Sequence, residues 1–464
     1  MCNVSLNGTQ PTDASIRVLR ALEAAGLEAW YVGGWVRDAL MGRPSHDVDM
    51  CCSGLWQESK EALEAADIAV VESGIKFGGI TAICDDERIE VTTYRLDGFY
   101  TDGRHPQSVE RAASLEDDLA RRDFTANAMA WHPERGLVDR YDGQGDLDRK
   151  LIRAVGDPKR RFNEDALRML RAVRFACRLD FMIEPKTEQA LAECAPLLDA
   201  VARERVGIEL EGILSTGHGG DAMLRYPELI CAAVPELAAG RGFDQRSVYH
   251  AFNVYEHIAR VLTVAGELAL CDGFTPSMSL MWAAFLHDVS KPDCFTVDHA
   301  GSGHFYGHPE LGAKKARAIM DRLALSHDLV RDVCLLIKYH DKPLRPERSC
   351  LLNMMRLLSG EGVDTPRLMD ELMDLKRADT LGKAPSCFYY VETIEEMRSL
   401  AHDLLEAGEP YSLKMLAING GDLIRAGVKP GPELGQLLNA ALEAVIEDNI
   451  PNDRETLLVH LNLN

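Results

Sequence analysis

The sequence lacks a long hydrophobic run, a CxxC cysteine pair and any tract of low complexity. No stretch reaches the roughly 20 apolar residues that a membrane-spanning helix needs. The first sixteen residues contain no Lys or Arg and no apolar run follows them, so we expect no secretory signal peptide. The twelve cysteines are scattered along the chain, which is typical of reduced thiols, and we therefore expect a cytoplasmic location.

An excess of basic charge is also missing, because the 464 residues carry a formal net charge of −22. Nucleic-acid binding favours a basic surface, so this value argues weakly against such a partner. The stretch from Lys150 to Arg178, however, contains nine Lys and Arg against three Asp and Glu. A basic patch is therefore expected in this stretch, although the whole chain is acidic.

The hydrophobic pattern predicts an α+β fold, with a head of mixed sheet and helices followed by an elongated all-α body. In the head we expect a helix over 15–30, strands over 29–32 and 47–51, a helix over 35–41, and a hairpin that pairs 80–84 with 88–94. Beyond about residue 150 the pattern is helical. Its breaks are Gly- and Pro-containing loops near 216–220, 272–277, 298–309 and 427–432.

Two carboxylates stand two positions apart at the end of the segment Tyr31–Asp49. On a strand, Asp47 and Asp49 point to the same face, and Glu90 on a neighbouring strand is a third candidate ligand. Adjacent carboxylates repel each other and suit a divalent cation such as Mg²⁺. Gly33 and Gly34, before a helix, would let a phosphate approach backbone N–H groups. A solvated loop is the alternative, and it would be favoured for an Asp-x-Asp motif standing alone.

Three motifs together resemble the class II nucleotidyltransferases, which comprise CCA-adding enzymes, their CC- and A-adding relatives and bacterial poly(A) polymerases. The motifs are GGxVRDxLxGRxxxDxD from Gly33, Arg121-Arg122-Asp-Phe-Thr-Ala-Asn127 and Glu164-Asp165-Ala-Leu-Arg168, and the resemblance covers about residues 25–215. It implies Mg²⁺-dependent nucleotidyl transfer at Asp47 and Asp49, beside which Glu90 stays a candidate from its strand position alone. It also implies that Gly34, Arg37 and Arg122 bind the nucleotide, and Gly33 is added to them because it belongs to the same glycine turn.

The resemblance makes Asp165 and Arg168 the reader of the incoming base, and hydrogen-bond chemistry agrees with that role. Cytosine and adenine each present an amino donor beside a ring-nitrogen acceptor, which Asp and Arg complement. Uracil and guanine present the reverse order and would leave buried groups unpaired. We expect one helix around Glu164–Leu179, from which Arg171 and Arg174 reach phosphates. A solvated charged helix face is the alternative.

Histidines and aspartates in the second half of the chain resemble the HD phosphohydrolase domain over about residues 245–385. The resemblance implies metal ligands at His257, His287, Asp288 and Asp379, with His308 and His340 as candidates for a second ion. Imidazole and carboxylate ligands suit Mn²⁺, Ni²⁺, Fe or Zn²⁺, which would activate water for attack on a phosphoester. Lys291 would help to place the phosphate. A lone His-Asp pair would be structural in most proteins.

Two segments bear on the product. The loop Tyr94–Val109 resembles a flexible loop that CC-adding members lack, so it favours CCA or A addition. The Gly- and Pro-containing segment Ala417–Gly435 resembles the tail with which family members hold the acceptor and TΨC arms of tRNA. Plain helical packing is an equally good interpretation of any single tail residue.

We therefore predict an enzyme that adds CCA to tRNA 3′ ends from CTP and ATP. The alternatives are an A-adding enzyme or a poly(A) polymerase, a metal phosphohydrolase that acts on RNA ends or nucleotides, and a non-catalytic RNA-binding protein. The predicted domains are a nucleotidyltransferase head (1–150), a helical neck (151–225), an HD-type domain (226–390) and a helical tail (391–464). The sequence does not predict an oligomeric state.

Overall fold

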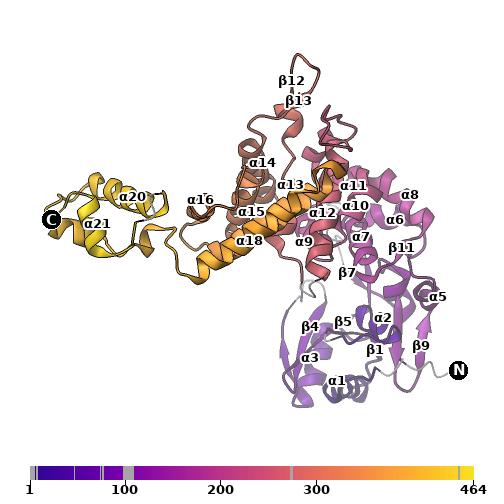
Figure 1. Ribbon diagram of the computed structural model, residues 1–464. Helices are drawn as coiled ribbons and strands as arrows, with labels where there is room; N and C mark the ends of the chain where they lie inside the picture. Colours follow the sequence, from indigo (N-terminus) through magenta and orange to yellow (C-terminus); the bar gives the residue numbers. More distant parts are fainter. Residues whose placement is uncertain are drawn as a thin grey trace. The chain divides into compact units, whose positions relative to one another are not determined.

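A mixed sheet forms the centre of the first part of the computed structural model, which describes residues 6, 9–45, 47–73, 75, 78–97, 109–271, 275–447 and 450–463. Within these ranges seven strands pair in the order β3-β4-β5-β2-β1-β8-β9. Among the described strands of this sheet, β2 and β5 pair in parallel and the other neighbours pair antiparallel. The strands are β1 (Ala29–Val32), β2 (Val48–Cys52), β3 (Ala69–Val71), β4 (Gly79–Cys84), β5 (Glu87–Thr93), β8 (Met129–His132) and β9 (Gly136–Asp139) (Figure 1).

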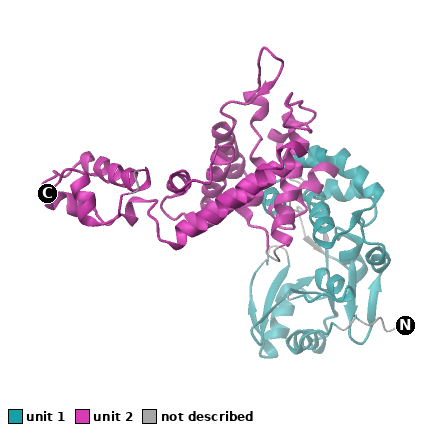
Figure 2. Cartoon of the chain, viewed as in Figure 1, with its two compact units in different colours: residues 1–210, 226–233 teal, residues 211–225, 234–464 magenta. Residues whose placement is uncertain are grey.

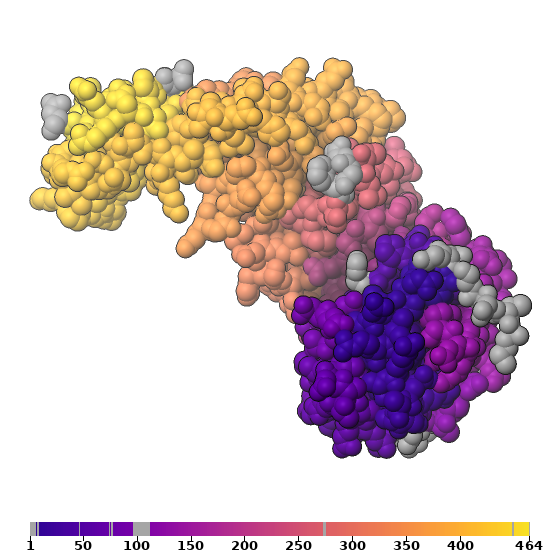
Figure 3. Space-filling view, turned by 90° about the horizontal axis from the view of Figure 1, so that it is seen from below, coloured from indigo at the N-terminus to yellow at the C-terminus, as the bar shows by residue number. Residues whose placement is uncertain are grey.

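The chain divides into two units, one of residues 1–210 with 226–233 and one of residues 211–225 with 234–464 (Figure 2). In the space-filling view the indigo and purple atoms of the head lie together (Figure 3). The other elements that begin in the first unit are α1 (Asp13–Ala24), α2 (Gly34–Leu40), α3 (Trp56–Ala65), β6 (Arg95–Asp97), β7 (Val109–Arg111), α4 (Leu115–Ala120), η2 (Thr125–Asn127), α5 (Gly143–Asp148), β10 (Leu151–Ile152), α6 (Pro158–Glu164), α7 (Leu167–Leu179), β11 (Met182–Ile183), α8 (Pro185–Cys194), η3 (Ala195–Ala200), α9 (Arg203–Leu214) and α11 (Pro227–Ala233).

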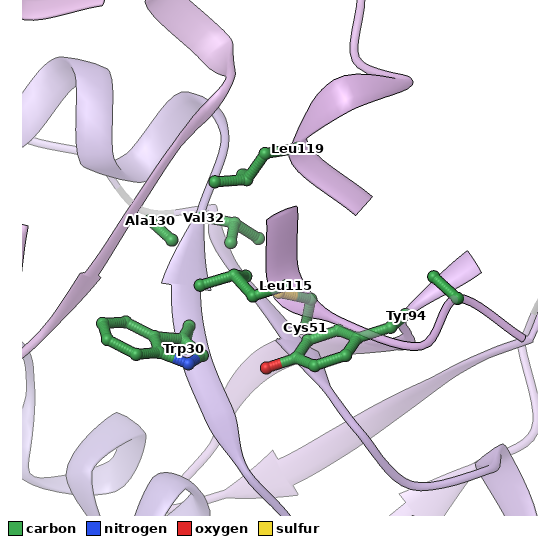
Figure 4. Close-up of a cluster of buried hydrophobic side chains, with 8 residues drawn as sticks. Trp30, Val32, Cys51, Tyr94, Leu115, Leu119 and Ala130 are labelled. Atoms are coloured by element: carbon green, nitrogen blue, oxygen red, sulfur yellow. The ribbon is translucent and has the colours of Figure 1, made fainter. Parts of the chain in front are cut away.

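Alternation along the strands places the head's apolar side chains on both faces of the sheet, and all four residues of β1 are buried. On one face Trp30 and Val32 of β1 meet Cys51 of β2 and Leu115 and Leu119 of α4 (Figure 4). Asp49 precedes Cys51 by two positions on β2, so its side chain points to this same face. The buried cluster therefore ends where the predicted carboxylate site begins.

Helices make up most of the second unit, as the sequence predicts. Within it α12 packs against α13 and α17, and α15 packs against α13 and α14. The elements are α10 (Gly219–Arg225), η4 (Pro235–Gly240), α12 (Val254–Cys271), α13 (Met278–Leu286), η5 (Lys291–Cys294), β12 (Thr296–Val297), β13 (Gly303–His304), α14 (His308–Arg322), α15 (His327–Tyr339), α16 (Arg348–Leu358), α17 (Thr365–Gly382), η6 (Pro385–Cys387), α18 (Tyr390–Glu406), η7 (Leu413–Met415), α19 (Gly420–Arg425), α20 (Pro432–Glu447) and α21 (Arg454–His460).

The α+β head and helical body are confirmed, but several predicted boundaries are wrong. The first helix ends at Ala24 and not at residue 30, because Gly26 adopts a φ of +79° and turns the chain into β1. Two short strand pairs, β10 with β11 and β12 with β13, interrupt the helical region. Among the predicted loops, 216–220 and 298–309 contain the starts of α10 and α14. The four-domain division stays a prediction.

No helix in the described ranges is both long enough and apolar enough to cross a membrane. The strongly apolar helix α13, Met278–Leu286, has only nine residues and is buried within the second unit. Its hydrophobicity is therefore accounted for by core packing.

Candidate active site

Asp49 on β2 lies opposite Glu90 on β5, because the two strands pair in parallel with these residues in register. Asp49 is mostly buried, whereas Glu90 and Asp47 are exposed. Asp47 lies one residue before β2, so the predicted strand start was one position too early. Burial, together with the negative charges of Glu90 and Asp47, raises the pKa of Asp49 to about 6. A divalent cation would relieve this repulsion, so the carboxylates fit the Mg²⁺ that the sequence predicts.

A glycine turn brings the backbone against these carboxylates. Gly33 has a φ of +68° and precedes the first residue of α2. A Cβ atom at Gly33 would lie 3.0 Å from Nη1 of Arg122 and 3.4 Å from Oδ2 of Asp49. Both the backbone conformation and the lack of space therefore require glycine at this position. Gly34 lines the same cavity as Gly33, Asp47 and Asp49.

Arg37, one turn into α2, is buried at the wall of this cavity. Its Nη1 donates to Oδ1 of Asn127 at 2.8 Å, and its Nε donates to Oδ1 of Asp38 at 2.8 Å. The guanidinium also lies 5.3 Å from the centroid of the Phe175 ring. Because these partners fix its position, Arg37 presents a positive charge at a defined place beside the glycine turn.

A buried aspartate holds two arginines at the other side of Asp49. The carboxylate of Asp118 is fully buried and accepts from Nη2 of Arg121 at 2.6 Å and from Nη2 of Arg122 at 3.1 Å. Burial alone would raise the pKa of Asp118, but the guanidiniums of Arg122 and Arg121 hold it below its ordinary value. Arg122 therefore stays charged and ordered next to Asp49.

Two adjoining cavities of about 760 and 450 Å³ meet at these residues. The larger one contains the glycine turn and a row of arginines, and we call it the phosphate lobe. The smaller one extends toward the start of α7, and we call it the base lobe. Both are lined by Asp49, Glu90, Arg122, Asp123 and Arg171. A ligand that fills both lobes would contact the carboxylates at its centre.

Asp165 and Arg168 both line the base lobe, although the single helix expected around Glu164–Leu179 is wrong. The helix breaks at Asp165, which has an extended backbone (φ −146°, ψ 105°) between α6 and α7. Its Oδ1 accepts from the Leu167 N–H at 3.0 Å, and its Oδ2 accepts from Nη2 of Arg205 at 3.0 Å. An aspartate carboxylate commonly accepts a hydrogen bond from a backbone N–H two residues further on. Here this contact orients the Asp165 carboxylate into the base lobe.

The Arg168 guanidinium has hydrogen-bond partners other than the Asp165 side chain. Its Nη1 donates to Oε2 of Glu164 at 3.0 Å and its Nη2 to the Arg121 carbonyl at 3.1 Å. The guanidinium is buried, so its remaining donor directions are set by these two contacts. The two predicted base readers are thus placed in one cavity by separate supports.

Arg171 and Arg174 point along the phosphate lobe, and each has a carboxylate partner. Arg171 donates from Nε and Nη2 to Oδ2 of Asp123 at 2.9 and 2.8 Å, and Arg174 donates from Nε to Oε2 of Glu209 at 2.7 Å. Both guanidiniums lie over the Phe175 ring, at 5.4 and 4.9 Å from its centroid. A row of ordered cations therefore lines the lobe that contains the glycine turn.

A second cluster, in the other unit, brings together all six predicted HD-site residues. Nε2 of His257 lies 3.2 Å from Oδ2 of Asp288 and 3.1 Å from Oδ1 of Asp379. Nε2 of His287 lies 3.2 Å from the same Asp288 oxygen and 3.4 Å from Nε2 of His257. The ligand atoms of His257, His287 and Asp288 thus converge, and Asp379 adjoins them through its contact with His257; we call these four residues subsite one.

The other oxygen of Asp288 faces a second pair of histidines. Its Oδ1 lies 3.4 Å from Nε2 of His308 and 3.7 Å from Nε2 of His340, and these two nitrogens are 3.4 Å apart. We call Asp288, His308 and His340 subsite two. One carboxylate therefore belongs to both subsites and would bridge two ions.

The backbone fixes the tautomer that each of the four rings adopts in its neutral form. Nδ1 of each histidine lies 2.7–3.2 Å from a carbonyl oxygen, which can only accept a hydrogen bond. Nδ1 must then carry the proton, and in the neutral ring the Nε2 lone pair points at the cluster. Lone pairs facing one another at 3.4 Å are unfavourable without a cation between them. The donor set fits a transition metal for this reason.

A cavity of about 300 Å³ opens onto this cluster. Lys291 is buried at its wall, with Nζ 2.7 Å from Oδ2 of Asp288 and 3.1 Å from Oε1 of Gln245. His250 also lines the cavity, and burial lowers the pKa of its ring to about 2. Neutral His250 and charged Lys291 could both donate hydrogen bonds to an anion in this cavity.

The sequence did not predict the residues that hold the predicted side chains in place. Asp118 and Asp123 lie beside the Arg121-Arg122 motif, and Arg205 and Glu209 stand some forty residues beyond Asp165. Asp123 and Asn127 lie inside a recognised motif and could have been assigned from it. Arg205 and Glu209 carry no local signal, because only the fold brings α9 against α7. Residues 98–108 of the Tyr94–Val109 loop lie outside the described ranges.

Four family models match successive parts of the chain. They describe a poly A polymerase head domain over residues 29–153, a "Probable RNA and SrmB- binding site of polymerase A" over 180–239, an HD domain over 254–383 and a tRNA nucleotidyltransferase domain 2 over 387–461. The nucleotidyltransferase and HD modules therefore occur here in one chain.

Relatives match along almost the whole length. The chain is 32% identical over 451 residues to the CCA-adding enzyme of Streptococcus thermophilus, covering 96% of this chain and 95% of the relative. It is 32% identical over 450 residues to that of Lactiplantibacillus plantarum, covering 95% and 93%. Among solved structures, the Bacillus stearothermophilus CCA-adding enzyme in complex with CTP superposes with a TM-score of 0.71 at 25% identity, covering 98% of this chain and 97% of that one. The Thermotoga maritima CCA-adding enzyme complexed with tRNA shares the fold, with a TM-score of 0.61 at 21% identity over 99% and 97%.

Proposed function

The chain belongs to the family of CCA-adding enzymes, and from this membership we propose that it builds and repairs the CCA end of tRNA from CTP and ATP, releasing pyrophosphate. The structural observation that carries the proposal is the pairing of Asp49 with Glu90 where the phosphate and base lobes meet. The relatives named above are CCA-adding enzymes, and they match over almost their whole length. This similarity does not favour the A-adding, poly(A) or phosphohydrolase alternatives. The cytoplasmic location stays a prediction.

In this proposal Asp47, Asp49 and Glu90 hold Mg²⁺, which would activate the tRNA 3′-hydroxyl and neutralise the leaving pyrophosphate. The rest of the phosphate lobe positions the nucleoside triphosphate. Gly33 and Gly34 allow the phosphates to approach the backbone, and Arg37, Arg122, Arg171 and Arg174 supply fixed positive charge. Because these guanidiniums are already held by carboxylates, little order has to be gained when the nucleotide binds.

Asp165 and Arg168 select the base from the other lobe. The Asp165 carboxylate accepts from the exocyclic amino group of cytosine or adenine, and Arg168 donates to the ring nitrogen beside it. Uracil and guanine would place a carbonyl oxygen against Asp165 and an N–H against Arg168, so both contacts would be lost. Selection of C and A thus needs no nucleic-acid template.

We infer that tRNA is held through its acceptor and TΨC arms by the tail around Ala417–Gly435. In the tail, Asn419 caps α19 and Asp422 binds both Arg425 and Arg454, so this segment is a fixed structure. Such a surface suits shape and backbone contacts with an RNA helix.

The test of the proposed function is incorporation of labelled CTP and ATP into tRNAs that end before CCA, after C, or after CC. We expect C addition to the first two and A addition only after CC is complete. An enzyme that adds A to all three, or continues an A tract, would establish one of the alternative products instead.

Arg205 gives a prediction about base selection. Arg205→Ala removes the ion pair that orients Asp165, and a hydrogen bond to a charged group contributes about 1.5–3 kcal/mol. We expect the preference for CTP over UTP, measured as a ratio of kcat/KM values, to fall by about 10- to 100-fold. Arg203→Ala is the matched control, since Arg203, on the same helix, pairs with the exposed Asp199 instead of Asp165. Equal effects of the two variants would contradict the role of Arg205.

We further propose that the HD cluster binds transition-metal ions, Mn²⁺, Ni²⁺, Fe or Zn²⁺, at the two subsites. The observation that favours it is the convergence of four Nε2 atoms on the two oxygens of Asp288. Ions held there would supply a metal-activated water for phosphoester hydrolysis, and Lys291 would orient the phosphate. The head remains the site of nucleotide addition.

Asp288→Ala is expected to remove bound metal from the second unit, because Asp288 contributes to both subsites. Mn²⁺ bound to the purified full chain in excess Mg²⁺, which fills the head carboxylates, should fall to background when measured by mass spectrometry. Asp328→Ala, at an exposed carboxylate of α15, serves as the control and should retain it. Equal metal content in the two variants would contradict the proposed centre.

A further inference from the structure

A buried lysine on α17 connects the two subsites of the HD cluster. Lys376 is 6% exposed, and its Nζ donates to the carbonyl oxygens of His340 and Lys342, each at 2.7 Å. Both carbonyls lie just past the last residue of α15, where the chain leaves the helix. His340, which belongs to subsite two, is itself the C-cap residue of α15.

The end of a helix leaves its last carbonyl groups without partners inside the helix. When such an end is buried, a side-chain donor must replace water, and a cation also complements the negative end of the helix dipole. Lys376 does both for α15. Its two short contacts fix the turn after His340, and so fix the direction in which the His340 ring enters the cluster.

The same helix also carries a ligand of subsite one. Asp379 lies three positions after Lys376 on α17, so the two side chains occupy neighbouring positions on one helix face. Asp379 in turn accepts from Nζ of Lys383 at 2.6 Å. A displacement of α17 would therefore move Asp379 directly and the His340 turn through Lys376.

We propose that Lys376 is a positioning residue that sets subsite two relative to subsite one and is needed for binding of the second ion. The inference rests on the proposed metal centre. The side chains of subsite one have supports other than Lys376, since His257 and His287 contact backbone carbonyls and Asp379 accepts from Lys383. Loss of Lys376 is therefore expected to weaken binding of the ion at subsite two and to leave binding of the ion at subsite one unchanged.

The test is Mn²⁺ binding to the full chain in excess Mg²⁺, which fills the head carboxylates, with Lys376→Met compared with wild type. Wild type is expected to bind two Mn²⁺ ions at the HD cluster and to show the electron paramagnetic resonance signal of an exchange-coupled pair. In Lys376→Met the second ion should bind about 10- to 100-fold more weakly, as is usual when an outer partner of a ligand is lost. At sub-saturating Mn²⁺ the variant should then show the signal of an isolated ion, and Lys376→Arg should restore coupling.

Lys338→Met is the matched control, because Lys338 is an exposed lysine on α15. It should bind both ions as wild type does. Incorporation of CTP by the head reports that the variants are folded, and Lys376→Gln, too short to span both carbonyls, replaces Lys376→Met if the latter does not fold. Two ions of unchanged affinity in Lys376→Met, or loss of both ions together, would overturn the inference and leave the metal centre standing. Absence of Mn²⁺ from wild type would overturn the centre itself.

Discussion

Replacing Asp49 with Asn is expected to abolish nucleotide addition and at the same time to stabilise the metal-free protein. Asp49 is the mostly buried member of the carboxylate group, and it stands in register with Glu90. A metal ion that polarises phosphoryl oxygens contributes several kcal/mol, and each 1.36 kcal/mol is a factor of ten in rate. We therefore expect incorporation of CTP and ATP to fall by at least about 10³-fold.

Asp49→Asn is expected to lower activity but to raise the free energy of unfolding of the metal-free protein. The pKa of Asp49 is raised from 3.8 to about 6 by burial and by Glu90, so the ionised form costs the folded state about 3 kcal/mol at neutral pH. This cost is fully present above about pH 6 and disappears below the ordinary pKa of 3.8. In a metal chelator, Asp49→Asn should unfold at a higher temperature than wild type at pH 8, and the difference should shrink as the pH is lowered toward 4.

Thermal unfolding at several pH values measures this difference. Asp85→Asn is the control, since Asp85 is an exposed aspartate at the β4–β5 turn of the same sheet. A variant that is inactive but no more stable than wild type would contradict the repulsion argument. A variant that is still active would contradict the assignment of the catalytic carboxylates.

Asp165→Ala is expected to relax base choice while leaving the metal site intact. A site built to hydrogen-bond its substrate discriminates against analogues by about 10⁴–10⁵-fold in kcat/KM. Removing one of the two hydrogen-bonding side chains is expected to lose much of this discrimination. We expect the kcat/KM preference for CTP over UTP, and for ATP over GTP, to fall by about 10²–10³-fold. Dependence of the remaining activity on Mg²⁺ should be unchanged, because Asp165 does not belong to the carboxylate group.

Asp199→Ala removes a carboxylate that is largely exposed, and it should leave the preference as it is. Unchanged nucleotide preference in Asp165→Ala would exclude Asp165 as a base reader. Loss of all activity with the same preference would instead indicate that Asp165 is needed for the architecture of the lobe.

The sequence predicted residues whose side chains share a short motif, because their contacts are local. Asp49 and Glu90 stand on or beside predicted strands, although their register appears only in the structure, and the glycine turn follows from Gly33-Gly34. The break at Asp165 was not predictable from helical periodicity, since an aspartate that caps its own backbone overrides a pattern of apolar residues on both sides. The pattern predicts a continuous helix at that point, and the structure has two.

The hydrogen bonds that hold site residues from distant parts of the sequence could not be predicted, for a different reason. Arg205 reaches Asp165, and Lys376 reaches the His340 turn, across forty and thirty-six positions of sequence. No sequence motif around Arg205 or Lys376 indicates the group to which the side chain is hydrogen-bonded. The six HD-site residues were predictable as a set because a family pattern orders them, but the bridging position of Asp288 between two subsites appears only in the structure.

We propose that the carboxylates of the head, and not the HD cluster, add C, C and A to tRNA. The sequence of the products formed from a tRNA that lacks CCA, with all four nucleoside triphosphates present, tests this for wild type, Asp49→Asn and Asp288→Ala. We expect CCA ends with wild type and Asp288→Ala, and no addition with Asp49→Asn. Addition by Asp49→Asn, or its loss in a folded Asp288→Ala, would contradict the proposal.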